Sequence, residues 1–156
     1  MSFDVVTEFE DKMAEFFGAP YAIAVDWREE DWTDYYQLGN TNIIDAAVLW
    51  KPNSYIDNTF MCLSFQFRKH LNLGRGGMIL TDDPIAAVDL KMMSYDGRTP
   101  DVPWREQNIS TMGFHYYMTP ETALLGIEKL DEAIETPPHQ WKVTDWPDLR
   151  KMGVFK

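Results

Sequence analysis

The stretch of sequence that decides the fold is Thr59–Thr81, TFMCLSFQFRKHLNLGRGGMILT. It opens with an apolar run at residues 60–63 and closes with a second apolar run at residues 78–80, and both have the length of a buried strand. A glycine cluster at residues 74–77 precedes the second run, as is typical of a tight loop. The stretch therefore predicts two buried strands joined by a loop.

The loop between these strands is basic, although the chain as a whole is acidic. It carries Arg68, Lys69 and His70, and no acidic residue occurs between Asp57 and Asp82. The whole chain has 25 acidic against 14 basic residues. A basic loop rich in glycine favours an anionic ligand, because backbone N–H groups and positive side chains meet there. The alternative is a plain hairpin whose lysine is only solvated.

Composition and length favour a single globular domain of 156 residues, with 45% hydrophobic and 14% aromatic residues. The formal net charge of -11 argues against non-specific binding of nucleic acid, which needs a basic face. Ten of the acidic residues lie within residues 1–34, and we interpret them as a solvated face, with a metal site as the minor alternative.

The cysteine count, the N-terminal residues and the length of the apolar runs limit the kind of protein further. The single Cys62, set among apolar neighbours, excludes an internal disulfide or a multi-cysteine zinc site and is expected to be a buried, inert thiol. Residues 1–7 lack the features of a signal peptide, and no apolar run is long enough to cross a membrane. We therefore expect a cytoplasmic protein with no membrane contact.

Three helices and further strands are predicted around the central stretch. The helices span Val5–Phe17, ended by Gly18, then 84–93, begun by Asp83 and Pro84, and 120–134, begun by Thr119 and Pro120. The second helix is expected to bury Ile85, Val88 and Met92, and the third Ala123, Leu124, Ile127 and Leu130. Strands are expected at Tyr21–Val25 and at 42–44, and residues 26–39, 51–58 and 95–107 are expected to be connections.

The strand at residues 42–44 ends at an acidic residue, Asp45. In α/β folds, ligand contacts often occur at the end of a buried strand, so Asp45 is a candidate binding residue. An ordinary loop or capping acid is the alternative.

Four blocks of this sequence, in order, resemble the DegT/DnrJ/EryC1/StrS family of pyridoxal-phosphate-dependent sugar aminotransferases. The blocks are FEDKMAEFFGAPYAIAV at 9–25, IIDAA at 43–47, the pattern SF, K, GRGGM and TDD within 64–83, and GFHYYMT at 113–119 with the helix after it. The resemblance covers roughly residues 3–25 and 40–135.

The resemblance implies a role for four residues of this chain. Lys69 would be the catalytic Schiff-base lysine and the proton carrier, and Asp45 would keep the pyridine nitrogen of pyridoxal 5'-phosphate protonated. Ser64 would donate to the cofactor phosphate. His115 stands where the family has an asparagine that reaches a phosphate across the dimer interface, and histidine can donate there too.

A lysine forms an imine only through its neutral amine, so the site must favour that form. Phe65, Phe67 and Leu71 would remove water from Lys69, and Arg68 would add a neighbouring like charge.

The implied fold is α/β, a truncated version of the large domain of fold-type I pyridoxal-phosphate-dependent transferases, with a sheet flanked by helices. We expect residues 1–136 to form this single domain and 137–156 to form an irregular tail packed on it. The resemblance also implies a homodimer, which uses nucleotide-linked sugars and an amino-acid donor.

The sequence departs from the family in ways that bear on activity. After residue 25 the family begins a helix whose N–H groups hold the phosphate, whereas this chain has the acidic stretch 26–30. Val48, Arg75 and Tyr117 replace a histidine or glutamine, a glutamate and an arginine. The resemblance leaves no counterpart for what the family has between the first two blocks, and we expect the chain to stop where the family's small C-terminal domain would begin.

Two hypotheses therefore stay open. The chain is either a shortened aminotransferase that uses Lys69, or a non-catalytic remnant that acts as a binding or structural partner, for example of a full-length relative. A weaker third hypothesis is a metal site made of His70, His115 and His139, whose spacing fits no known ligand pattern. We expect no metal.

Overall fold

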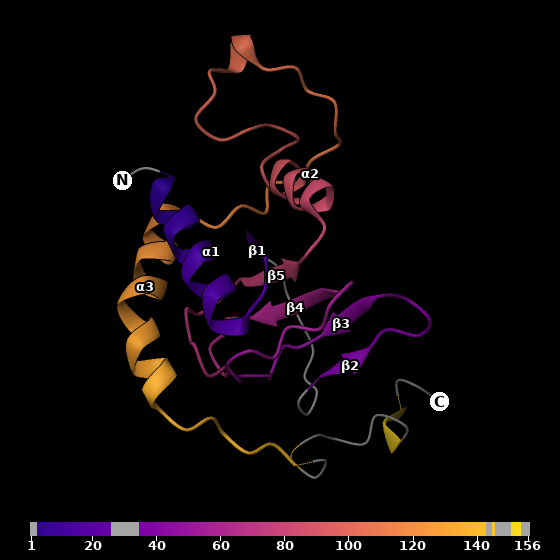
Figure 1. The fold of residues 1–156 in the computed structure, drawn as a ribbon, viewed down its shortest axis with the longest axis vertical. Coiled ribbons are helices and arrows are strands. Elements are labelled where there is room, and N and C mark those ends of the chain that lie inside the picture. The colour runs from indigo at the N-terminus through magenta and orange to yellow at the C-terminus, as the bar shows by residue number, and fades with distance from the viewer. Residues whose placement is uncertain (1–2, 26–34, 143–144, 146–150, 154–156) are drawn as a thin grey trace.

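The structure is a computed structural model, and it describes residues 3–25, 35–142, 145 and 151–153 (Figure 1). The elements in chain order are α1 (Asp4–Phe17), β1 (Tyr21–Val25), β2 (Tyr36–Gln37), β3 (Ile43–Asp45), β4 (Phe60–Ser64), β5 (Gly77–Thr81), α2 (Pro84–Ser94), a 3-10 turn (Trp104–Glu106) and α3 (Pro120–Glu135). The predicted α/β class, with a sheet flanked by helices, is confirmed.

The five strands form one mixed sheet in the order β1-β5-β4-β3-β2. The pair β3–β4 is parallel, and the other three pairs are antiparallel. The central stretch forms the antiparallel pair β4–β5, in register from Met61 opposite Leu80 to Ser64 opposite Gly77. The two strands predicted within that stretch are therefore confirmed, and they occupy the middle of the sheet.

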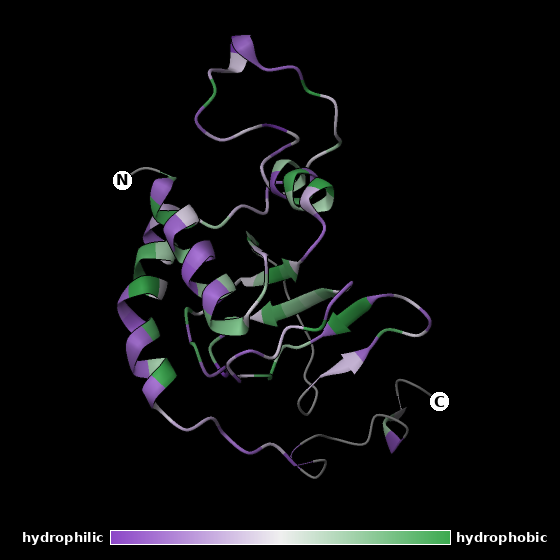
Figure 2. Cartoon of the chain, viewed as in Figure 1, coloured by the Kyte–Doolittle hydropathy of each residue, from purple (hydrophilic) through white to green (hydrophobic). Residues whose placement is uncertain are grey.

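Helices α1 and α3 pack against each other and cover one face of the sheet (Figure 1). Alternate strand residues point to this face, since the side-chain period of a strand is two. The buried core there includes Phe9, Met13, Phe17, Ile44, Met61, Leu63, Met78, Leu80, Ala123 and Leu130. Figure 2 shows the result in α1 and α3, which carry hydrophobic and hydrophilic residues on different sides.

The close approach of α1 and α3 depends on one glycine. A Cβ atom on Gly126 would lie 2.6 Å from Cζ of Phe9, whose side chain is completely buried. Such a distance is far below van der Waals contact, so only glycine allows the Phe9 ring to lie against the α3 backbone.

The predicted helix boundaries are confirmed by their caps. Gly18 has a φ of 70° and ends α1 in the left-handed conformation. Oδ1 of Asp83 accepts hydrogen bonds from the backbone N–H groups of Ile85 and Ala86, and Oγ1 of Thr119 accepts one from Thr122.

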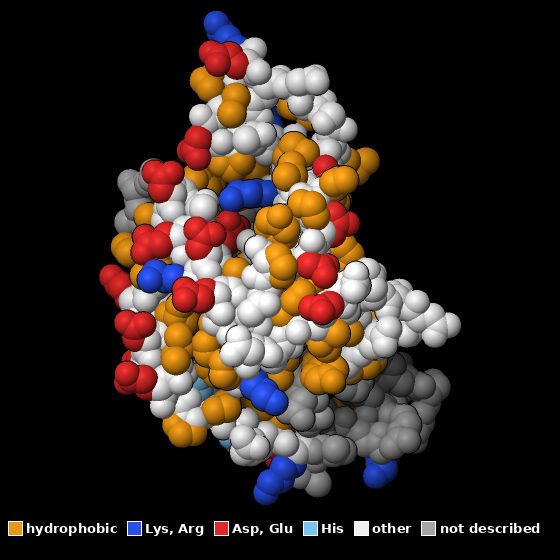
Figure 3. Space-filling view, viewed as in Figure 1, with side chains coloured by type: hydrophobic (Ala, Val, Ile, Leu, Met, Phe, Trp, Pro, Cys, Tyr) orange, Lys and Arg blue, Asp and Glu red, His pale blue; other side chains and the backbone are white. Residues whose placement is uncertain are grey.

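The prediction for the buried side of α2 is wrong. Ile85 and Val88 are exposed, Ile85 to 74%, and Met92 is only partly buried. The inward side of the helix instead carries the small Ala86 and Ala87, followed by Leu90 and Ser94. Small residues let α2 lie close to β1 and β5, and this turns the larger side chains outward. Figure 3 shows hydrophobic side chains on the surface in the region of α2.

Two other expectations are wrong, those for residues 35–39 and for Glu10. The buried side of α3 differs from its prediction in part. Residues 35–39 are not only a connection, because Tyr36–Gln37 forms edge strand β2; residues 26–34 lie outside the described residues. Glu10 does not belong to a solvated face, since it is buried. In α3 the buried residues are Ala123, Gly126, Leu130 and Ala133, while Leu124 and Ile127 are half-buried.

Cys62 is buried and free of a disulfide, as expected. Among the described residues, no helix combines the length and the apolar character that crossing a membrane requires.

Candidate functional site

The candidate site is built on the loop that connects β4 to β5. The loop is closed at its neck by hydrogen bonds from the N–H of Phe65 to the carbonyl of Gly76 (2.8 Å) and from the N–H of Leu73 to the carbonyl of Phe65 (2.9 Å). Gly74 and Gly76 have φ values of 88° and 83°, which explains why glycine is required at these turns. The glycine cluster thus shapes the turn that closes the loop of residues 66–73.

Lys69 lies inside this loop and is 7% exposed. Its backbone N–H donates to the carbonyl of Gln66, and the side chains of Phe65 and Leu71 are buried in the core beside it. Phe67 does not take part, because it is 61% exposed and lies against the Arg68 guanidinium, 5.4 Å from its ring centre. Of the three apolar neighbours expected to remove water from Lys69, Phe65 and Leu71 are buried and Phe67 is not.

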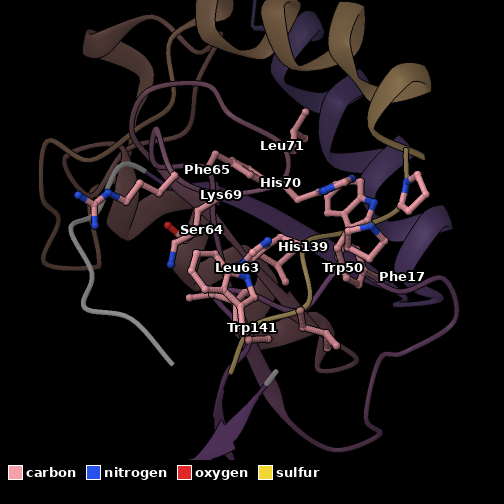
Figure 4. A pocket seen from close by; sticks show the side chains of 17 residues that line it. Phe17, Trp50, Leu63, Ser64, Phe65, Lys69, His70, Leu71, His139 and Trp141 are labelled. Atoms are coloured by element: carbon pink, nitrogen blue, oxygen red, sulfur yellow. The ribbon is translucent and has the colours of Figure 1, made fainter. Parts of the chain in front are cut away.

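A pocket of about 450 Å³ opens beside Lys69 (Figure 4). The residues that line it are Phe17, Ala46, Ala47, Val48, Leu49, Trp50, Leu63, Ser64, Phe65, Arg68, Lys69, His70, Leu71, Pro137, Pro138, His139 and Trp141. Among the residues that the structure describes, this lining contains two cationic side chains and two histidines but no carboxylate. In a chain with a net charge of -11, such a lining favours an anion.

Ser64 brings a hydroxyl group to the same pocket. It is the last residue of β4, and its side chain is buried. Its Oγ accepts from the backbone N–H of Gln66 at 3.5 Å, an arrangement in which the hydroxyl proton can be donated to a ligand. The structure thus brings together Ser64 and Lys69, two of the four predicted site residues.

Trp50 and His70 form a clamp next to Lys69 that the sequence pattern did not predict. The carbonyl oxygen of Ala133, in the last turn of α3, accepts from Nε1 of Trp50 at 3.1 Å and lies 2.7 Å from Nε2 of His70. A carbonyl only accepts, so His70 bonds to it through a protonated Nε2. The two rings also pack together, with centres 5.0 Å apart.

The reason for the clamp is Pro137. In a continuing helix the carbonyl of Ala133 would accept from the N–H of residue 137, but proline has none. Trp50 and His70 supply the missing donors, and in doing so they fix the residue that follows Lys69. The Pro137–Pro138 pair was the available signal, since a helix that ends at two prolines leaves carbonyls that need other partners.

Asp45 does not line the Lys69 pocket. It ends β3, and its Oδ1 accepts from the backbone N–H of Ala47 at 3.0 Å. Its side chain lines a second, largely apolar hollow of about 470 Å³ on the other sheet face, together with Leu38, Ile43, Phe60, Cys62, Ile79 and Leu90. The next residues, Ala46 and Ala47, do line the Lys69 pocket, so Asp45 lies at its border.

His115 also lies away from the pocket. It pairs with Tyr95 in an isolated bridge next to α2, and its Nδ1 lies 3.0 Å from Oδ2 of Asp96. The side chain is 73% exposed, so it is accessible to another molecule. Of the three histidines, His70 and His139 line the pocket and His115 does not. Within the part of the chain that the structure describes, no three His, Cys, Asp or Glu side chains form a candidate metal site.

The tail after α3 contributes a wall that the sequence analysis did not predict. Pro137, Pro138, His139 and Trp141 line the pocket, and Figure 4 shows His139 and Trp141 among Leu63, Ser64 and Lys69. The rings of His139 and Trp141 meet edge to face, with centres 4.5 Å apart. The expectation that the tail was irregular left no basis for placing these side chains.

The chain is similar to proteins of one kind. It is 30% identical over 96 residues to GDP-perosamine synthase of Caulobacter vibrioides. The match covers 59% of this chain and 25% of that protein. Its fold matches AtS13 of Actinomadura melliaura with a TM-score of 0.66 at 16% identity, covering 84% of this chain and 60% of that one. It matches PseC of Helicobacter pylori, an aminotransferase involved in the biosynthesis of pseudoaminic acid, with a TM-score of 0.64 at 12% identity, covering 83% and 58%.

The chain thus spans a quarter of the curated relative and about three fifths of each of the two structures. The two structural matches confirm the fold. Residues 56–144, more than half of the chain, match the DegT/DnrJ/EryC1/StrS aminotransferase family, and they contain the whole β4–β5 loop with Lys69. The chain belongs to the DegT/DnrJ/EryC1/StrS aminotransferase family.

Proposed function

We propose that this chain is a sugar aminotransferase that binds pyridoxal 5'-phosphate through Lys69. The observation that carries the proposal is the lining of the Lys69 pocket. A buried amine and a buried hydroxyl line one pocket together with Arg68, and none of the described residues in its lining carries a carboxylate, in a protein that is strongly acidic.

The residues of the pocket fit the aldehyde and the phosphate of this cofactor. Lys69 offers the amine, while Ser64 and Arg68 offer the donors that a phosphate requires. The fit at the pyridine nitrogen is weaker, because Asp45 lies at the border of the pocket and its Oδ1 accepts from Ala47. We propose Asp45 as the partner of that nitrogen on the basis of its position at the end of β3.

The chemistry divides between the cofactor and the chain. When bound, pyridoxal phosphate supplies an aldehyde that condenses with an amine and releases water, and a ring that withdraws electrons from the substrate carbon. The chain would bind the cofactor and orient it. Nζ of Lys69 would hold the cofactor and carry a proton, Oγ of Ser64 would donate to the phosphate, and Phe65 and Leu71 would exclude water.

The substrates and partners are part of the same proposal. We propose a nucleotide-linked sugar and an amino-acid donor as substrates, a homodimer as the assembly, and the cytoplasm as the location. In the dimer, His115 would reach a phosphate in the site of the second copy. Its exposed ring, outside its own chain's pocket, supports a role towards another molecule.

The position of Asp45 keeps the second candidate function open. A chain whose acid does not face the cofactor pocket is what a non-catalytic remnant would show, and such a remnant would act as a binding or structural partner of a full-length relative. The two candidates differ in whether the Lys69 pocket still takes its cofactor.

An absorption titration tests the proposal. Purified protein is titrated with pyridoxal phosphate beside three variants: Lys69→Ala, Ser64→Ala and the surface control Lys12→Ala. We expect a visible band in the wild type and in Lys12→Ala, none in Lys69→Ala, and weaker binding by about tenfold in Ser64→Ala, which loses one charge-assisted hydrogen bond. An equal band in Lys69→Ala, or no band in the wild type, would support the remnant.

A further inference from the structure

We propose that Trp141 is a ligand-binding residue of the Lys69 pocket, where its indole forms the wall against which the flat ring of an aromatic aldehyde packs. The proposal rests on the proposed function and extends it to a residue of the tail after α3. It also assigns a role to residues 137–141, which carry that residue to the pocket.

The pocket has a polar side and an aromatic side. The polar groups Ser64, Arg68 and Lys69 come from β4 and the loop after it. Aromatic rings come from Trp50 and from the tail residues His139 and Trp141 (Figure 4). One side of the pocket offers an amine and hydrogen-bond donors for an anion, and the other side offers flat rings. Such a pocket suits a planar, anionic aldehyde.

Trp141 brings a ring to the pocket from the tail. Its side chain lines the pocket and is half-buried there, and its ring meets that of His139 edge to face, with centres 4.5 Å apart. Trp50 has a structural role, since it packs on His70 at 5.0 Å and on Phe16 at 4.8 Å and donates to the Ala133 carbonyl.

Contacts at its start hold the segment that carries Trp141. Trp50 and His70 bind the Ala133 carbonyl, and Pro137 and Pro138 stiffen the chain that follows. Beyond Trp141, Lys142 and Asp145 bond to each other within the tail: the N–H of Lys142 donates to Oδ2 of Asp145 at 2.8 Å, and the N–H of Asp145 donates to the carbonyl of Lys142 at 2.8 Å. A segment restrained at its start is partly preorganised for binding, which lowers the entropic cost of ordering it.

The competing interpretation is that the tail blocks the pocket. The two interpretations differ in the sign of one effect. If Trp141 is a wall, its removal weakens the binding of pyridoxal phosphate. If Trp141 is a plug, its removal strengthens that binding, because the ligand no longer has to displace it.

The experiment measures the affinity of the full chain for pyridoxal phosphate by absorption titration. The variants are Trp141→Ala, Trp141→Phe and Trp104→Ala, the last being a matched control on the loop between α2 and α3, where Trp104 lies under Arg98 at 3.7 Å. We expect affinity to fall by about three- to tenfold in Trp141→Ala, the worth of one ring contact. Trp141→Phe keeps a ring and should stay within about twofold of the wild type, and Trp104→Ala should not change.

A second measurement shows whether the pocket of Trp141→Ala is intact. Formaldehyde with cyanoborohydride methylates accessible amines and needs no ring contact, and peptide mapping reports the rate at Lys69. We expect this rate to be equal or higher in Trp141→Ala, while the affinity for pyridoxal phosphate is lower. Tighter or unchanged binding of pyridoxal phosphate by Trp141→Ala overturns the proposal.

The outcomes separate this inference from the proposed function. If the wild type attaches pyridoxal phosphate to Lys69 and Trp141→Ala binds it as tightly, only the role of Trp141 is wrong. If the wild type attaches none at Lys69, the proposed function fails, and the role of Trp141 fails with it.

Discussion

Nζ of Lys91 on α2 lies 2.9 Å from Oε2 of Glu10 on α1 and so joins two helices that are far apart in the sequence. The other carboxylate oxygen, Oε1, accepts from the backbone N–H of Ala24 in β1 at 2.9 Å. Glu10 therefore ties α1, α2 and the edge strand β1 together through one buried carboxylate. An acid within an amphipathic helix gave no sign of this role, because both of its partners are distant in the chain.

Replacing Glu10 should destabilise the fold according to what the new side chain can accept. Glu10→Gln keeps an oxygen for the Ala24 N–H, whereas Glu10→Ala leaves that N–H without its acceptor and Lys91 without its charge partner. We expect Glu10→Ala to cost about 2–3 kcal/mol of unfolding free energy and Glu10→Gln clearly less. Urea denaturation measures both. Equal losses would show that the Ala24 hydrogen bond contributes nothing.

The same residue predicts a pH dependence. Burial raises the pKa of the Glu10 carboxyl above its usual 4.5, although Lys91 and the Ala24 N–H act in the opposite direction. A carboxyl with a raised pKa in the folded state binds more protons there than in the unfolded state, so its contribution to stability falls as the pH rises from about 4.5 through the raised value. The stability of the wild type relative to Glu10→Gln should therefore fall over this range. A rising difference would contradict the assignment.

Gly126→Ala should destabilise the contact between α1 and α3. The new methyl group would meet the buried Phe9 ring at 2.6 Å, and the resulting shift should cost about 1–3 kcal/mol. The double variant Phe9→Leu with Gly126→Ala should lose less than the sum of the two single losses, since the smaller side chain makes room. Gly153→Ala is the control, because no atom of the described residues would lie within 4 Å of the new methyl group. An unchanged midpoint in Gly126→Ala would mean that the helices are not in close contact.

The clamp on Ala133 predicts coupling between Trp50 and His70. Trp50→Phe and His70→Phe each keep a ring but lose one donor to the carbonyl, and each should cost about 1 kcal/mol. The double variant removes both donors from a carbonyl that Pro137 cannot serve, so it should lose more than the sum. Denaturant midpoints of the four proteins complete the cycle. Strict additivity would contradict a shared acceptor.

The orientation of α2 predicts that its larger outward side chains tolerate charge. Ile85→Lys should change the unfolding free energy by less than about 0.5 kcal/mol, as is usual for an exposed site. Leu90→Lys is the matched comparison, and it should cost several times more, because Leu90 lines the hollow on the sheet face. Similar losses of unfolding free energy at both positions would mean that the Ile85 side of α2 is buried as well, contrary to the structure.

The sequence predicted the features that depend on local patterns. Apolar runs gave the strands β4 and β5, and the capping residues Asp83 and Thr119 gave the starts of α2 and α3. The family and the fold followed from four blocks in order, because motif spacing within one chain does not require knowledge of distant contacts.

The features that depend on distant contacts were not predictable in the same way. The buried side of α2 was misjudged because hydrophobicity alone does not reveal that small residues allow closer packing. The clamp by Trp50 and His70 joins residues 63 or more positions away from Ala133. The wall formed by Trp141 lies in a segment without periodicity. The roles of Lys69, Asp45, Ser64 and His115, and the division at residue 136, stay predictions.

The central claim is that Lys69 is the residue that takes pyridoxal phosphate. The most direct measurement is reduction of the protein with borohydride in the presence of pyridoxal phosphate, followed by mass spectrometry of its peptides, beside Lys69→Arg. We expect one cofactor per chain, attached to Lys69, and none in the variant. Label spread over the surface lysines, or equal label in Lys69→Arg, would contradict the account.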